Sequence, residues 1–157
     1  MSKITKEEVK RLSDPDQIRM EVAECFGWSW YAFMRHPGRD DDNAYAFSDS
    51  IYDFLPSPQP ERTWKKLDQK PEELPYKKWE YVCELPNWTG ELSACNKLID
   101  AIVNSDGSIT IQRDQTGTNV HIHFSHPVEV FDRKTEIAIC KAFLLWHLDT
   151  GLPLNIQ

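Results

Sequence analysis

The chain lacks several features that identify large classes of protein. It holds four cysteines, and no two of them form a Cys-x-x-Cys pair, which argues against a zinc knuckle and a redox motif. No run of about 18 apolar residues is present to span a membrane. Residues 1–8 lack the apolar run of a secretory signal. These absences predict reduced thiols and a cytoplasmic protein without a membrane segment.

Positive charge is also scarce. Lys and Arg together number 18 against 25 Asp and Glu, which gives a net charge of −7. A negative field of this kind repels the phosphate backbone, so we expect no direct binding to nucleic acid. The acidic excess lies in residues 1–56 and 91–157, whereas residues 57–90 are neutral.

The length of 157 residues is that of one ordinary domain, and we predict a single domain over residues 1–157. Residues 28–77 are rich in proline and aromatic residues. Because proline interrupts helices, this segment is expected to be an irregular insertion. A short strand is expected near its start, and a short helical turn over Ser48–Phe54.

Apolar residues at helical spacing predict helices over about residues 15–26, 90–104 and 132–149. In the last helix, apolar side chains occupy two opposite sides, with Phe143 on one and Leu144 on the other. Such a helix lies between two layers of the fold or buries its second side in another copy of the chain. We therefore expect a homo-oligomer.

Alternating apolar residues predict a strand over residues 78–85 and a β-hairpin over 108–124, which Pro127 ends. Side chains of a strand alternate between its two faces, so one hairpin face should be polar. The expected polar face consists of Thr110, Gln112, His121 and His123. The fold class predicted is α+β, with a small antiparallel sheet of three to four strands sandwiched by the three helices.

Three stretches, residues 15–28, 85–94 and 134–145, resemble a group of small phage and prophage proteins that carry the phage ABA-sandwich domain. They look like that family's helix ending in Gly-Trp, its Pro-aromatic-Thr entry to the central helix, and its C-terminal helix. The resemblance implies a phage or prophage origin, an antiparallel sheet with helices on both faces, and a role in the host cytoplasm. The family is mostly without assigned activity, so no functional residue is carried over.

Three histidines form the pattern His-x-His-x-x-His at His121, His123 and His126. Two of them, His121 and His123, point to the same side of a strand, as two zinc ligands would. The local sequence supplies no further ligand at a matching position, so we expect no metal site. The same two histidines could act as the acid and the base of a phosphodiesterase. Such enzymes carry two copies of a His-x-Thr or His-x-Ser motif, whereas this chain has the single sequence His121-Ile122-His123.

Two further clusters lie in the irregular segment. Asp40–Asn43 is expected to be a solvated acidic turn, because consecutive side chains point in different directions and the calcium-loop spacing is absent. Trp28 and Trp30 are expected to pack in the core. Just beyond them, Arg35 and Arg39 suit contacts to a phosphate group on a binding loop.

No motif fixes a reaction, and the sequence favours a small phage-encoded binding protein over an enzyme. We expect no cofactor, and a host defence protein or a small nucleotide signal as partner. One alternative is a phosphodiesterase that uses His121 and His123. A second alternative is an acidic DNA mimic that inhibits a DNA-binding enzyme. The expected ligand-binding residues are Arg35, Arg39, Thr110, Gln112, His121 and His123.

Overall fold

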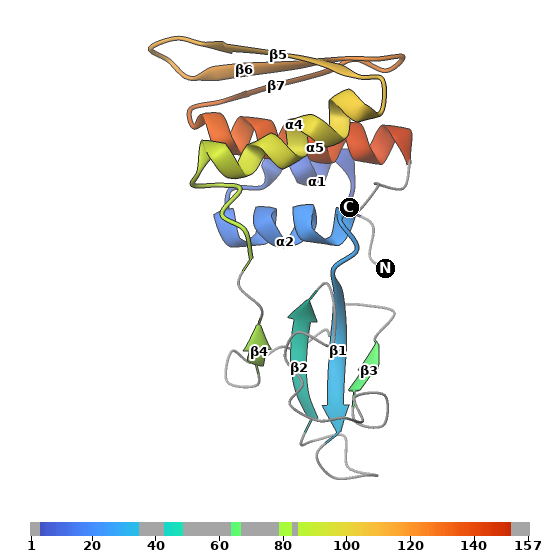
Figure 1. Ribbon diagram of the computed structural model, residues 1–157. Helices are drawn as coiled ribbons and strands as arrows, with labels where there is room; N and C mark the ends of the chain where they lie inside the picture. The colour runs from blue at the N-terminus through green and yellow to red at the C-terminus, as the bar shows by residue number, and fades with distance from the viewer. Residues whose placement is uncertain (1–3, 35–42, 49–63, 67–78, 83–84, 152–157) are drawn as a thin grey trace. The chain divides into compact units, whose positions relative to one another are not determined.

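The computed structural model describes residues 4–34, 43–48, 64–66, 79–82 and 85–151 (Figure 1). Contacts divide the chain into two compact units. The first comprises Met1–Lys3 and Gly27–Glu84, and the second comprises Ile4–Phe26 and Leu85–Gln157. None of the helices within these described ranges is both long enough and apolar enough to cross a membrane.

The first unit contains a four-stranded sheet with the strand order β3-β1-β2-β4. Its strands are β1 (Ser29–Met34), β2 (Asn43–Ser48), β3 (Trp64–Lys66) and β4 (Trp79–Val82). β1 pairs antiparallel with β2 and β3, whereas β4 runs parallel to β2.

The sequence predicts one short strand in residues 28–77, and the structure corrects this by placing three strands there. Aromatic residues favour strands, and the prolines of this segment all lie outside the three strands. The predicted helical turn over Ser48–Phe54 lies, beyond Ser48, outside the described residues.

Two aromatic rings form a buried contact in the first unit. Trp30 is 3% exposed and Phe47 is 0% exposed, and their ring centroids are 4.9 Å apart. Trp28 lies against the same Phe47 at 5.6 Å. The expected core packing of Trp30 is therefore confirmed, while Trp28 is only half-buried.

In its described residues the second unit has four helices and a three-stranded antiparallel sheet, which confirms a small α+β fold. Its helices are α1 (Lys6–Arg11), α2 (Pro15–Cys25), α4 (Leu92–Asn104) and α5 (Thr135–Thr150). Its strands are β5 (Ser108–Arg113), β6 (Thr118–His123) and β7 (Val128–Asp132), in the order β5-β6-β7. The three predicted helices and the hairpin are thus present, with ends that differ by a few residues.

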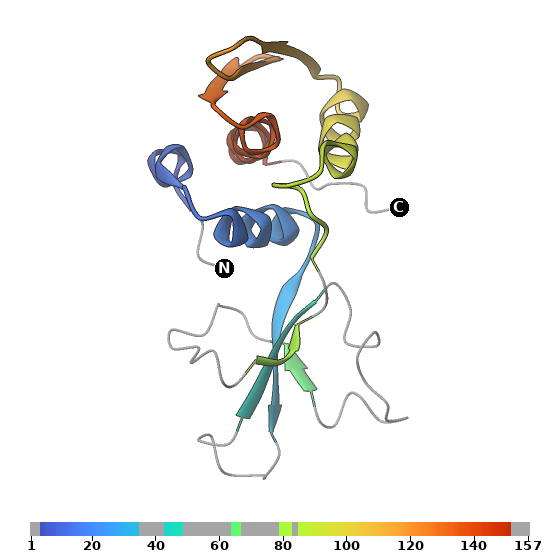
Figure 2. The ribbon, with the colours of Figure 1, turned by 90° about the vertical axis from the view of Figure 1, so that its left-hand side faces the viewer.

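Helix α5 lies at the centre of the second unit (Figures 1 and 2). It packs against β6 and β7 on one side and against α1, α2 and α4 elsewhere. Both of its apolar sides are covered within the chain, so Phe143 is 0% and Leu144 2% exposed. Packing within the chain therefore explains why α5 is apolar on two sides. The homo-oligomer stays a prediction, and the pattern of α5 no longer supports it.

The described helices cover only one face of the β5-β6-β7 sheet (Figure 2). Val120, Ile122 and Val130 are buried on the covered face. On the opposite face Phe131 is 57% exposed. The layers of this unit therefore run sheet, helix, helix. The α+β class holds, but the sheet is not sandwiched by helices as the sequence predicts and as the family resemblance implies.

Stacked aromatic rings join the helices of the second unit. The Phe26 ring stacks on Phe143 at 5.5 Å between centroids and on Trp88 at 5.9 Å. The Trp88 carbonyl accepts hydrogen bonds from the thiols of Cys95 (3.0 Å) and Cys140 (3.4 Å). Both cysteines are fully buried and free, as the interpretation of the thiols as small core residues predicts.

A half-buried histidine near the end of α5 makes stability depend on pH. Burial lowers the pKa of His147 from its ordinary 6.5. Between that lowered pKa and about 6.5, the unfolded chain therefore binds more protons than the folded chain, and stability falls as pH falls through this window. We expect His147→Gln to lose less stability between pH 7.5 and 5.5 than the unchanged chain, measured by urea unfolding.

His126→Gln is the matched control because His126 is exposed in the same unit. It should retain the pH dependence of the unchanged chain. Equal losses of stability for the unchanged chain and His147→Gln would contradict the prediction.

Candidate functional site

The uncovered face of the β5-β6-β7 sheet gathers polar side chains in three rows. Strand register places Gln112 beside Asn119 and Asn119 beside Phe131. The second row consists of Thr110, His121 and Glu129, and the third row consists of Ser108 and His123. This register confirms the predicted polar face. We call it the open face, and it comprises Ser108, Thr110, Gln112, Asn119, His121, His123, Glu129 and Phe131.

Strand β7 supplies two residues that the sequence analysis missed, Glu129 and Phe131. The sequence predicts that Pro127 ends the hairpin and that a helix begins near residue 132, so no strand is predicted between them. The signal for this strand is the separation of Val128 and Val130 by the polar Glu129. Asn119 was also missed, although the hairpin register places it beside Gln112.

The two histidines of the open face form a stack at one end. The ring centroids of His121 and His123 are 4.2 Å apart, with 30° between the ring planes. The Thr110 hydroxyl lies 3.3 Å from Nε2 of His123. Across the described part of the chain, no three His, Cys, Asp or Glu side chains gather in a way that holds a metal ion. The stack therefore offers imidazole and hydroxyl groups for hydrogen bonds.

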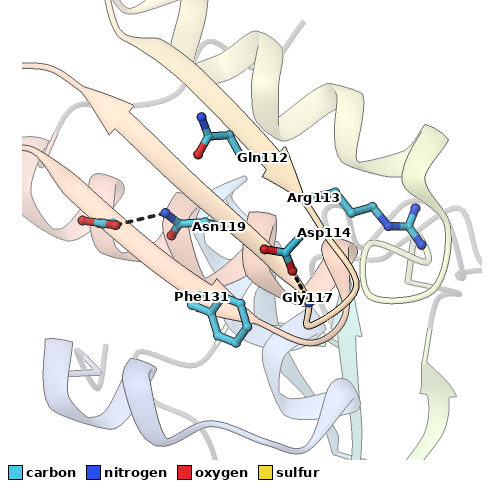
Figure 3. A pocket seen from close by; sticks show the side chains of 7 residues that line it. Gln112, Arg113, Asp114, Gly117, Asn119 and Phe131 are labelled. Carbon is cyan, nitrogen blue, oxygen red and sulfur yellow. Dashed lines mark hydrogen bonds between the residues drawn. The ribbon is translucent and has the colours of Figure 1, made fainter.

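A groove of about 400 Å³ lies at the other end of the open face (Figure 3). Such a volume is within the range of small-molecule sites. The groove is lined by Gln112, Arg113, Asp114, Gly117, Asn119, Glu129 and Phe131. Phenylalanine is usually buried, so the half-exposed ring of Phe131 beside amide side chains is the unusual feature of this groove.

A hydrogen-bonded turn fixes the rim of the groove. Asp114 Oδ1 accepts bonds from the Thr116 hydroxyl (2.6 Å), the Thr116 N–H (2.7 Å) and the Gly117 N–H (3.2 Å). The hydroxyl and backbone bonds from Thr116 lower the pKa of the Asp114 carboxyl, and the Gly117 bond adds to this effect. The turn that joins β5 to β6 is therefore tied to an ionised carboxylate.

Gly117 allows β7 to pass close to this turn. Its φ is +154°, and a Cβ there would lie 2.6 Å from the Asp132 carbonyl oxygen and 2.8 Å from Phe131 Cζ. We expect Gly117→Ala to push β7 away and to destabilise the chain by about 1–3 kcal/mol in urea unfolding. It should also change the NMR chemical shifts of the Phe131 ring.

Gly151→Ala separates backbone strain from crowding in this test. Gly151 also has a positive φ, +58°, but apart from its chain neighbours no atom of the described residues lies within 4 Å of a Cβ built there. This control should destabilise the chain through strain alone and leave the Phe131 shifts unchanged. Unchanged Phe131 shifts in Gly117→Ala would show that Gly117 does not set the position of β7.

The other predicted residues have separate outcomes. Arg35, Arg39 and Asp40–Asp42 lie outside the described residues, so the expected phosphate contact of the arginines stays a prediction. His126 follows β6, and its ring Nδ1 pairs with the Ser125 hydroxyl at 3.4 Å. The structure thus brings together four of the expected ligand-binding residues, Thr110, Gln112, His121 and His123.

Comparisons of the chain with family models, curated proteins and solved structures find no match. The resemblance to the phage ABA-sandwich family therefore stays an expectation. The side chains of the open face are therefore the only basis for proposing what it binds.

Proposed function

We propose that this protein is a non-enzymatic binding protein that holds a nucleotide on its open face. The observation that carries the proposal is the half-exposed ring of Phe131 in the groove, beside the amides of Gln112 and Asn119. An exposed aromatic ring offers a stacking surface for a nucleobase, which contributes about 1–3 kcal/mol per base. The two amides supply donors and acceptors for the polar edge of the base.

The histidine end of the open face suits the phosphate of the same ligand. His121, His123 and Thr110 all carry groups that donate hydrogen bonds to phosphate oxygens. Successive rows on one face of a strand are about 7 Å apart, because each residue rises about 3.4 Å. A nucleotide with its base over Phe131 would therefore extend its phosphate toward the histidine rows. These contacts must offset the repulsion from a chain of net charge −7.

The stacking of the histidines favours binding over phosphodiester cleavage. In such a reaction the attacking and leaving oxygens stand in line on opposite sides of the phosphorus, so the acid and the base must flank it. The centroids of His121 and His123 are 4.2 Å apart, which leaves no room for a phosphate between the rings. The phosphodiesterase alternative would require the two rings to separate.

The open face also supports binding over DNA mimicry. A mimic needs a row of acidic side chains in place of phosphates, and the open face carries one, Glu129, which is hydrogen-bonded to Asn119. Under the family resemblance, the bound nucleotide would be a defence signal of the bacterial host, which the protein would sequester. A host defence protein is the competing occupant of the same face.

The proposal is tested by calorimetric titration of the intact chain with adenosine, guanosine, cytidine and uridine monophosphates, and with inorganic phosphate as the control. We expect at least one nucleotide to bind at micromolar strength or tighter, and to be recovered unchanged after the protein is denatured. Recovery of a cleaved product from a dinucleotide would favour the phosphodiesterase. Absence of binding by all four nucleotides would overturn the proposal.

A further inference from the structure

The hydrogen-bonded pair of Asn119 and Glu129 lies between the two ends of the open face. We propose that the ligand is a ribonucleotide and that Glu129 recognises the hydroxyl groups of its ribose. This inference rests on the proposed function, because it assigns the part of the nucleotide between the base and the phosphate.

The order of residues along β7 carries the inference. Glu129 stands two residues before Phe131 on the same face, in the row that also contains His121. If the base lies over Phe131 and the phosphate at His123, two rows away, the sugar lies over the intervening row of Glu129. A ribose presents two neighbouring O–H donors, and a carboxylate is a side chain that only accepts hydrogen bonds.

The carboxylate of Glu129 is held in place for this role. The Asn119 amide donates to Glu129 Oε1 at 3.0 Å. Among the described residues this leaves Oε2 and the second lone pair of Oε1 as acceptors. Hydrogen bonds to a charged group are about twice as strong as those between neutral groups. The pair thus presents oriented acceptors beside the groove.

Charge supports the same assignment. Because Glu129 stands beside His121, its carboxylate repels a phosphate in that row. The phosphate is therefore expected at His123, one row further along, and Glu129 weakens a ligand that offers only negative charge at this row. It favours a ligand whose groups at this row are neutral O–H donors. Ribose meets this condition, whereas a 2′,3′-dideoxyribose provides no such donor.

The experiment compares a ribonucleoside monophosphate with its 2′,3′-dideoxy analogue, both carrying the base that binds best. We expect the ribonucleotide to bind the unchanged chain at least about tenfold more tightly. Glu129→Ala should remove this preference while it leaves the affinity for the dideoxy analogue equal or higher. Glu129→Gln, which keeps one carbonyl acceptor, should retain part of the preference. Asp100→Ala, which removes an exposed carboxylate of α4, should retain all of it.

Each outcome decides one claim. Equal binding of the two nucleotides by the unchanged chain would overturn the ribose inference and leave the proposed function standing. A ribose preference that persists in Glu129→Ala would overturn it too. Binding of neither nucleotide would instead overturn the proposed function.

Discussion

Phe143→Ala is expected to cost about 3–5 kcal/mol of the free energy of unfolding, a large part of the 5–15 kcal/mol that stabilises a typical domain. Phe143 is 0% exposed, lies on the central helix α5, and stacks on Phe26 with only 6° between the ring planes. Its removal leaves a cavity among rings that hold α2, α5 and Trp88 together. Urea unfolding followed by far-UV circular dichroism measures the effect.

Two variants make this prediction specific. Phe143→Leu keeps most of the side-chain volume, so it should cost clearly less than Phe143→Ala. Phe131→Ala removes the same ring from an exposed position and should change stability by less than about 0.5 kcal/mol. A small loss in Phe143→Ala would mean that the aromatic stack does not organise the second unit.

Phe131→Ala is expected to weaken nucleotide binding about fivefold to 150-fold, the equivalent of about 1–3 kcal/mol of lost stacking. The ring is 57% exposed and makes one wall of the groove, so its removal takes away contact with the base rather than with the core. The measurement is calorimetric titration with the ribonucleotide that binds the unchanged chain best.

Phe131→Tyr is the matched rescue, because tyrosine retains an aromatic ring of the same size at the rim. It should bind the nucleotide within a factor of a few of the unchanged chain. Equal affinities for Phe131→Ala and the unchanged chain would show that the base does not stack on this ring, even if a nucleotide binds.

Much of the second unit was predictable because its signals are local. The alternation of residues 108–124 predicted the hairpin and placed Thr110, Gln112, His121 and His123 on one face, as the register confirms. The two-sided apolar pattern of α5 predicted a helix between layers or at an interface. Sequence alone did not decide between these two interpretations, because the packing partners of α5 come from elements spread along the chain, namely α1, α2, α4, β6 and β7.

Other features depended on contacts that a local pattern does not contain. Strands β1, β2 and β3 are short, and three prolines lie in the stretch between β2 and β3. Strand β4 pairs with β2 across 30 intervening residues. The position of Phe131 depended on a similar contact. The local alternation around Val128 and Val130 could indicate a strand, but only the pairing of β7 with β6 places Phe131 beside Asn119 on the open face.

An NMR titration of the intact chain with the preferred ribonucleotide tests whether the ligand binds on the open face of the β5-β6-β7 sheet. We expect saturating changes in chemical shift at Asn119, His121, Glu129 and Phe131, while the amides of α1 stay unchanged. A nucleotide that binds with changes confined to other parts of the chain, or that produces no change at all, would contradict this expectation.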